Sequence, residues 1–208
     1  MKKKLLLSIF TTLVLLWSCE KEDETVATLS ADIKIGDTYG GGKVFYIASD
    51  RTFGLVAAPA DVNETGIAWS ELRVTIVTDS EIGTGAANTK KIIELKTKGD
   101  YEVYVAPDDE VYAAKVVDEW TEGGYSDWYL PSIDELTELY KQRDVVGGFD
   151  EDKKYWSSSA IDGGYASVSG YTWYYNFEPA AQSVKPAQVD LNQQNTYRVR
   201  AVRTIKAE

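Results

Sequence analysis

Apolar residues in the middle of the chain recur at intervals of three and four positions, which is the spacing of an amphipathic helix. The most regular set shares one helical face and consists of Ile133, Leu136, Leu139 and Tyr140. Ser132 stands where an N-cap belongs, and Glu135 follows three positions later, the arrangement of a capping box. The pattern therefore predicts a helix from Ile133 to about Val145, ended by Gly147-Gly148.

Two further helices are expected on the N-terminal side of this one. The first is short, follows Asn88 and carries its apolar residues inward. The second covers residues 110–121, with an N-cap supplied by Asp108 or Asp109 and a stop at Gly123-Gly124. Two helices joined by so short a turn should pack on one sheet.

Segments rich in β-branched and aromatic residues lie on both sides of the helices and predict strands. They cover residues 43–48, 54–58, 74–78, 155–159, 171–177 and 197–205. The first two form a hairpin around the turn at residues 49–52. The glycines at 40–42 precede a strand, whereas a phosphate-binding loop joins a strand to a helix, so we reject that function for them. This order of elements predicts an α+β fold with mixed or antiparallel sheets.

The strand at residues 171–177 supplies candidate ligand contacts. Alternation places aromatic residues on one face, which indicates a core face: Tyr171, Trp173, Tyr175 and Phe177. The opposite, outer face then carries Tyr174 and Asn176, and Tyr165 lies in the glycine-rich loop before the strand. Exposed aromatic rings stack on sugars and anchor protein partners. We therefore predict ligand contacts at Tyr165, Tyr174 and Asn176.

The N-terminus has the features of an export signal. Lysines at positions 2–4 precede a largely apolar stretch of 13 residues at 5–17, shorter than the roughly 20 that a transmembrane helix needs. The sequence Leu16-Trp17-Ser18-Cys19 resembles the lipobox of bacterial lipoproteins. This resemblance implies that residues 1–18 are a signal peptide and that Cys19 carries the lipid. The alternative is an ordinary secretory signal with an incidental thiol.

Residues 19–32 are expected to form a flexible acidic tether between the lipid and the domain. The acidic run at residues 20–24 is either a solvated spacer or a surface-export signal like that of Bacteroidota lipoproteins. Because two or more acyl chains anchor a protein stably, we expect attachment to the outer membrane through Cys19. The domain would then lie at the cell surface or, alternatively, face the periplasm.

Charge and composition exclude several classes of function. Removing residues 1–18 removes three lysines and changes the formal net charge from −11 to −14, so nucleic acid is not an expected partner. Histidine is absent, which excludes imidazole bases, imidazole-dependent triads and histidine metal sites. Cys19 is the only cysteine, and a lipid there would leave no thiol. We expect no enzymatic activity and no cofactor; a carboxylate-dependent polysaccharide hydrolase is the least favoured alternative.

Six dispersed blocks of sequence resemble the Lcl C-terminal domain family. They are Gly36–Ile47, Gly54–Pro59, Gly83–Thr89, Gly123–Leu139, Tyr155–Ser158 and Val199–Arg203. The resemblance extends from Ile33 to Ile205, and we assign the domain to residues 33–206. It implies a C-type-lectin-like fold, in which the N- and C-terminal strands pair, two main helices flank the sheets and long loops carry ligands.

A calcium site of the lectin type is not expected. In classical C-type lectins the ligands come from Glu-Pro-Asn or Gln-Pro-Asp and a later Trp-Asn-Asp. Here residues 178–180 read Glu-Pro-Ala, so Ala180 lacks the ligand oxygen, and no Trp-Asn-Asp follows. Calcium requires six to eight oxygens. The acidic clusters at residues 108–110 and 150–152 are expected to be solvated termini, and we predict no metal site.

These expectations favour a lipid-anchored receptor that binds a glycan or a surface protein. If the terminal strands pair, the loops at residues 160–170 and 178–195 point away from the membrane. A second hypothesis is a structural or assembly lipoprotein of the cell envelope that binds a protein partner through its sheet.

Overall fold

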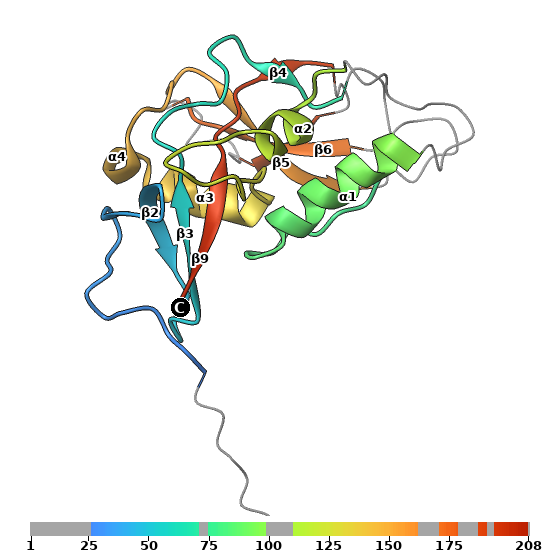
Figure 1. Cartoon of the computed structure of the whole chain (residues 1–208). Helices are drawn as coiled ribbons and strands as arrows, with labels where there is room; N and C mark the ends of the chain where they lie inside the picture. Colours follow the sequence, from blue (N-terminus) through green and yellow to red (C-terminus); the bar gives the residue numbers. More distant parts are fainter. Residues whose placement is uncertain are drawn as a thin grey trace, which may run out of the picture.

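The computed structural model describes residues 26–70, 75–98, 110–161, 171–178, 187–190 and 194–207. Its helices are α1 (Gly85–Lys98), α2 (Ala113–Asp118), α3 (Ile133–Lys141) and α4 (Arg143–Val146). Its strands are β1 (Thr38–Tyr39), β2 (Gly42–Ile47), β3 (Phe53–Ala57), β4 (Ile67–Ala68), β5 (Lys154–Ile161), β6 (Tyr171–Asn176), β7 (Ala187–Asp190), β8 (Thr196–Tyr197) and β9 (Val202–Lys206). The longest helices are α1 and α3, and both lie against sheet strands (Figure 1).

The predicted hairpin is confirmed and forms the centre of the first sheet, which has the strand order β1-β2-β3-β9. Val44 lies opposite Val56, and Ala57 lies opposite Val202. Two smaller sheets contain β4-β8 and β5-β6-β7, and the pairs within all three sheets are antiparallel. The α+β class with antiparallel sheets and two main helices is therefore confirmed, and it is consistent with a C-type-lectin-like fold.

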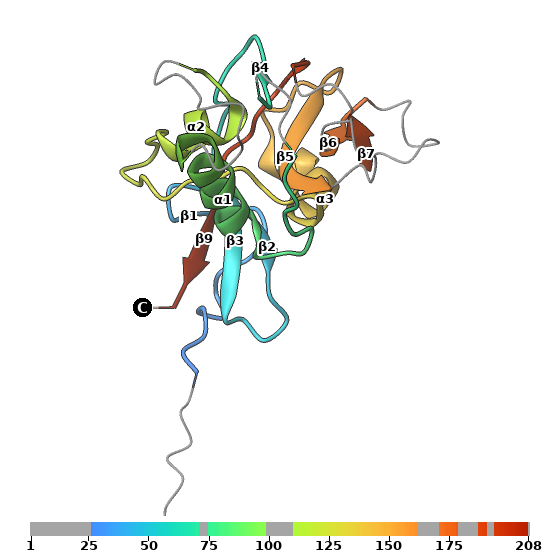
Figure 2. The same ribbon diagram turned by 90° about the vertical axis from the view of Figure 1, so that its right-hand side faces the viewer.

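Both ends of the described chain lie at the turn between β2 and β3 (Figures 1 and 2). The backbone N–H of Leu29 donates to the carbonyl of Arg51 at 2.8 Å, and Lys206 pairs with Phe53. The Arg51 guanidinium also donates to the carbonyls of Leu29 and Ile33, each at 3.1 Å. The last strand thus pairs with β3 of the N-terminal hairpin, whereas the first strand, β1, forms the outer edge of the sheet.

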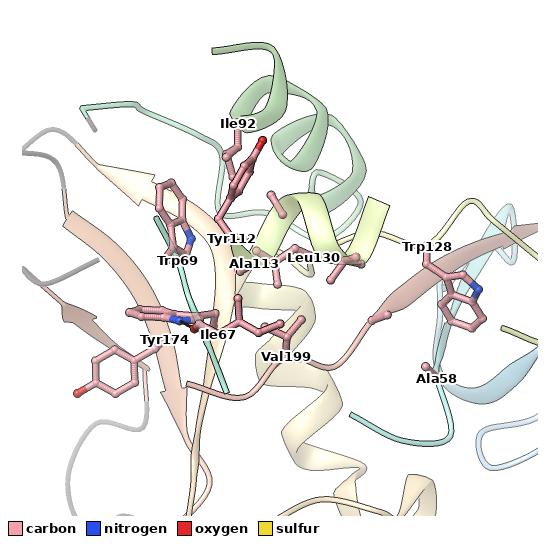
Figure 3. Close-up of a cluster of buried hydrophobic side chains, with 14 of the residues drawn as sticks. Ala58, Ile67, Trp69, Ile92, Tyr112, Ala113, Trp128, Leu130, Tyr174 and Val199 are labelled. Carbon is pink, nitrogen blue, oxygen red and sulfur yellow. Dashed lines mark hydrogen bonds between the residues drawn. The ribbon is translucent and has the colours of Figure 1, made fainter. Parts of the chain in front are cut away.

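The buried side chains form two hydrophobic clusters. The first gathers three tryptophans, Trp69, Trp128 and Trp156, with apolar residues of α1, α2 and β3. Figure 3 shows Trp69, Ile92 and Tyr112 at one end of this cluster and Trp128 beside Ala58 at the other. The second cluster is covered by α3, which buries the predicted face of Ile133, Leu136, Leu139 and Tyr140 against β2, β5 and β6. Full burial of one such side chain contributes roughly 1.5–3 kcal/mol.

The predicted capping box at the start of α3 is present. The Ser132 hydroxyl accepts the N–H of Glu135 at 3.2 Å, and the Glu135 carboxylate accepts the N–H of Ser132 at 2.8 Å. The other carboxylate oxygen accepts the N–H of Gly83 at 2.8 Å. Burial raises the pKa of Glu135, and the hydrogen bonds from these backbone groups oppose that shift. This carboxylate therefore joins α3 to the loop before α1.

We expect Glu135→Gln to lower the free energy of unfolding by about 1–3 kcal/mol, because the amide nitrogen must face either the buried N–H of Ser132 or the partly buried N–H of Gly83. Urea denaturation would measure the loss. The matched control is Glu138→Gln, since Glu138 only pairs with the exposed Lys141 and should contribute less than about 1 kcal/mol. Equal midpoints for the two variants would contradict the prediction.

Several predicted elements differ from the structure. The helix expected at 110–121 is shortened to α2, and Tyr112 stands at its N-cap without a side-chain hydrogen bond; Asp108 and Asp109 lie outside the described residues. Residues 75–78 are not a strand, although the N–H of Thr78 donates to the Ala160 carbonyl at 3.0 Å. The helix expected after Asn88 begins earlier, at Gly85.

The strand predicted at residues 197–205 is interrupted. Its ends form β8, which pairs with β4, and β9, which pairs with β3. Between them the chain changes sheets, and the side chain of Arg200 is fully buried. The backbone of Arg198 instead contacts β5: its N–H donates to the Lys154 carbonyl at 2.8 Å, and its carbonyl accepts the N–H of Trp156 at 3.0 Å.

Candidate functional site

A hollow of about 320 Å³ is lined by residues next to β4 and in β8. β4 lies at the end of the molecule opposite the described chain ends (Figure 1). We call this hollow the distal hollow. Side chains of both charges line it: Glu64, Asp152 and Glu178 are acidic, and Lys153, Lys154 and Arg198 are basic. The ring of Tyr197 lies among them.

The short β4–β8 pair shapes one wall of the distal hollow and brings Tyr197 to it. Gly66 has a φ of +83°, and a Cβ there would lie 3.1 Å from the carbonyl of Thr196, so this position requires glycine. Just before it, the Asn63 side chain accepts both the N–H and the hydroxyl of Thr65 at 2.7 Å. These contacts hold the loop in one conformation beside the hollow.

Two aromatic rings pack against Tyr197, one of the residues that line the distal hollow. The ring of Tyr197 packs on Trp156 with centroids 4.2 Å apart and on Tyr174 at 5.0 Å. The ammonium of Lys154 lies 5.1 Å from the Tyr197 centroid and 5.0 Å from that of Tyr174. Such cation–π contacts hold the lysine over the rings. Tyr197 and Lys154 are therefore positioned before any ligand arrives.

Arg198 and Lys153 play different parts in this hollow. Arg198 donates to the Asp150 carboxylate at 3.1 Å and to the Asn63 carbonyl at 3.0 Å, so its guanidinium is already engaged by the protein. The side chain of Lys153 is exposed. Lys153 is accordingly the cation of this wall that can turn towards a ligand.

A buried polar network lies on the protein side of this wall and is centred on Arg200. Its guanidinium donates to Asp61 at 2.8 Å, to the carbonyls of Ala58 and Gly147 at 3.2 Å each, and to the carbonyl of Gly148. It also lies over the ring of Phe149, 4.0 Å from the centroid.

Tyr155 extends the Arg200 network. Its hydroxyl donates to Asp61 at 2.9 Å and accepts the N–H of Asp150 at 2.9 Å. Burial raises the pKa of Asp61, and the Arg200 guanidinium opposes this shift; burial also raises the pKa of Tyr155. Because these groups are sealed from solvent and bonded to one another, the network holds the loops after β3 and α4 in place.

The structure describes two of the four residues that the sequence predicted for lipid attachment or ligand contact. Cys19 and Tyr165 lie outside the described residues. Tyr174 and Asn176 are buried, with exposed fractions of 6% and 8%, so the prediction that they occupy an outer face is wrong. The reason is that both faces of β6 are covered: Tyr174 belongs to the first hydrophobic cluster, whereas Tyr175 belongs to the second. The ring of Tyr174 packs against Tyr197, which lines the distal hollow, with centroids 5.0 Å apart.

Among the residues that line the distal hollow, Glu178 falls in the loop 178–195 that was expected to carry ligands, and the others were not predicted as site residues. Lys153 and Lys154 precede a predicted strand, and Tyr197 is the first residue of the predicted closing strand at residues 197–205. Arg198 and Arg200 alternate with Val199 and Ala201, which is the ordinary pattern of a half-buried strand, so no local signal separates Tyr197 from that strand.

Within the described ranges, no group of three or more cysteine, histidine, aspartate or glutamate residues is arranged to hold a metal ion. Asp150, part of the acidic run at 150–152, accepts hydrogen bonds from Arg198 and from the N–H of Asp152. Among the same described residues, no helix is both long and apolar enough to span a membrane.

The chain matches a known family over most of its length. Residues 61–203 match the sequence profile described as the Lcl C-terminal domain. The match begins after the β2–β3 hairpin, ends within β9 and includes the β4–β8 pair, β5, β6 and the distal hollow. No curated protein matches the chain.

Proposed function

The chain belongs to the Lcl C-terminal domain family, and on this premise we propose that it is a cell-envelope lipoprotein that displays a non-enzymatic ligand-binding domain. The observation that carries the proposal is the arrangement of the domain: the described chain ends lie at one end and β4 lies at the other (Figure 1). The distal hollow is lined by residues next to β4 and in β8. A lipid on Cys19 would place the first end towards the outer membrane. The distal hollow would then face outward, at the cell surface.

The chemistry of the distal hollow suits a neutral glycan. Carboxylates of Glu64 and Asp152 accept hydrogen bonds from sugar hydroxyls, and the ammonium of Lys153 donates to sugar oxygens. Since three acidic and three basic side chains line the hollow, they carry no formal net charge that would select an ion. Hydrogen bonds to charged groups are also stronger than those between neutral groups.

Binding rather than catalysis is supported by the surroundings of the acidic side chains. Glu64, Asp152 and Glu178 are exposed to solvent. A general acid of a glycoside hydrolase usually has a raised pKa, which requires burial or a neighbouring like charge. An exposed carboxylate is suited to hydrogen bonding with a ligand.

A glycan array with the full-length protein, run with and without calcium, tests this function. We expect binding to a neutral glycan that does not depend on calcium. Lys153→Glu should weaken it about tenfold or more, which corresponds to about 1.4 kcal/mol. The matched control is Lys34→Glu, the same charge change at an exposed residue near the chain ends. Equal binding by both variants would remove the distal hollow from the proposal.

The anchor has its own test. Metabolic labelling with palmitate should mark the protein, and Cys19→Ala should abolish the label while the domain still folds. An array without any bound glycan, together with one stoichiometric envelope protein in a pull-down, would instead favour an assembly lipoprotein.

A further inference from the structure

A second hollow lies along one face of α1, and nothing in the proposed function uses it. Its volume is about 460 Å³, within the range of roughly 300–1,000 Å³ that is usual for ligand pockets. We call it the α1 groove. One wall consists of Ala86, Lys90, Ile93 and Glu94; the other is formed by Asp118 at the end of α2 and by the segment 126–129.

The α1 wall follows from helical periodicity. Positions 86, 90, 93 and 94 fall on one face of the helix, whereas Asn88 and Ile92 are buried on the core side. Eight residues of helix rise by about 12 Å, so the groove accommodates about four residues of extended chain at roughly 3.3 Å each.

The groove combines an apolar floor with acidic edges. Ile93 and the buried Trp128 provide apolar surface, and Glu94, Asp118 and Asp127 bring three carboxylates against the single cation of Lys90.

The carboxylates at the edges of the groove differ in their neighbours. Asp127 already pairs with Arg203 of β9, whose guanidinium lies 3.8 Å from the centroid of the Tyr125 ring. Burial raises the pKa of the Asp118 carboxyl, and the neighbouring Glu119 raises it further. A cation brought next to Asp118 would stabilise its ionised form. Asp118 and the neighbouring Glu119 therefore make this edge of the groove negatively charged.

We propose that the α1 groove binds a short extended peptide segment of a partner protein through an arginine or lysine side chain. The long apolar stem of such a side chain covers Ile93, and its charged head reaches Asp118 and Glu94. Neither a purely apolar nor an acidic segment satisfies both features. The chain's own acidic run at residues 20–24 has the wrong net charge for this groove.

An array of capped tetrapeptide amides, probed with the full-length protein, tests the proposal. We expect the retained peptides to contain arginine or lysine, and replacement of that arginine by the isosteric, neutral citrulline to weaken binding about tenfold. Binding should also weaken as the salt concentration rises, because the carboxylates lie at the protein surface. Retained peptides without a basic residue, or no retained peptide, would overturn the proposal.

Single substitutions test whether the peptide binds in the α1 groove. Asp118→Asn should weaken the arginine peptide about tenfold without moving the urea midpoint, and Ala86→Gln should block the groove with a neutral side chain. The matched control is Asp144→Asn, at an exposed aspartate on α4. Unchanged affinity in both groove variants overturns the proposal. Equal affinity for free arginine amide or spermidine also overturns it, since the groove would then be a site for small amines.

Discussion

Replacing Arg200 with methionine should lower the free energy of unfolding by about 3–5 kcal/mol, the usual loss when one partner of a buried ion pair is removed. The side chain is fully buried, and its guanidinium donates to Asp61 and to three carbonyls. The methionine side chain fills much of the volume of the arginine side chain but has no N–H group. The Asp61 carboxylate and the carbonyls would then stay buried without their strongest donor.

Urea denaturation with unchanged cooperativity measures this loss. Lys34→Met is the control, since it removes an exposed cation and should change stability by no more than about 0.5 kcal/mol. A double variant, Arg200→Met with Asp61→Asn, separates charge from packing. It should recover part of the loss, because no uncompensated carboxylate remains. Losses that simply add would mean that the two side chains do not stabilise the fold as a pair.

Local rules predicted the elements whose signals lie within a few residues of each other. The capping box of Ser132 and Glu135 needs only a spacing of three, and the β2–β3 hairpin needs only two strand-like runs and a turn. The two-residue strands β4 and β8 could not be predicted in this way. Each contributes two residues, and the pair depends on partners about 130 positions apart, such as Ile67 and Tyr197.

The residues of the candidate site could not be predicted from such local patterns. Alternation correctly separates Tyr174 from Tyr175 on opposite faces of β6. It does not say whether a second layer covers the other face, and Trp156 and Tyr197 supply that layer here. The same stack brings Tyr197 to the distal hollow. The identity of the lining residues therefore follows from tertiary packing, which periodicity along one strand does not contain.

Replacing Trp156 with alanine should cost about 3–5 kcal/mol, as expected for a fully buried large aromatic residue. The indole ring packs on Tyr197 and meets Tyr174 edge to face, with centroids 6.2 Å apart. Its Nε1–H donates to the Ile67 carbonyl at 2.9 Å, which ties β5 to β4. Alanine would leave a cavity below the distal hollow and remove the surface on which Tyr197 rests.

Trp156→Phe separates the hydrogen bond from the packing. Phenylalanine keeps an aromatic ring but leaves the Ile67 carbonyl without its donor, so we expect a smaller loss of about 1–3 kcal/mol. Tyr39→Ala, at an exposed aromatic residue of β1, is the control and should have little effect. We expect the phenylalanine variant to fold, so its glycan affinity can be measured, and this affinity should fall as Tyr197 loses part of its support. A phenylalanine variant with the stability and affinity of the wild type would show that the indole N–H does not hold β4 and the distal hollow in place.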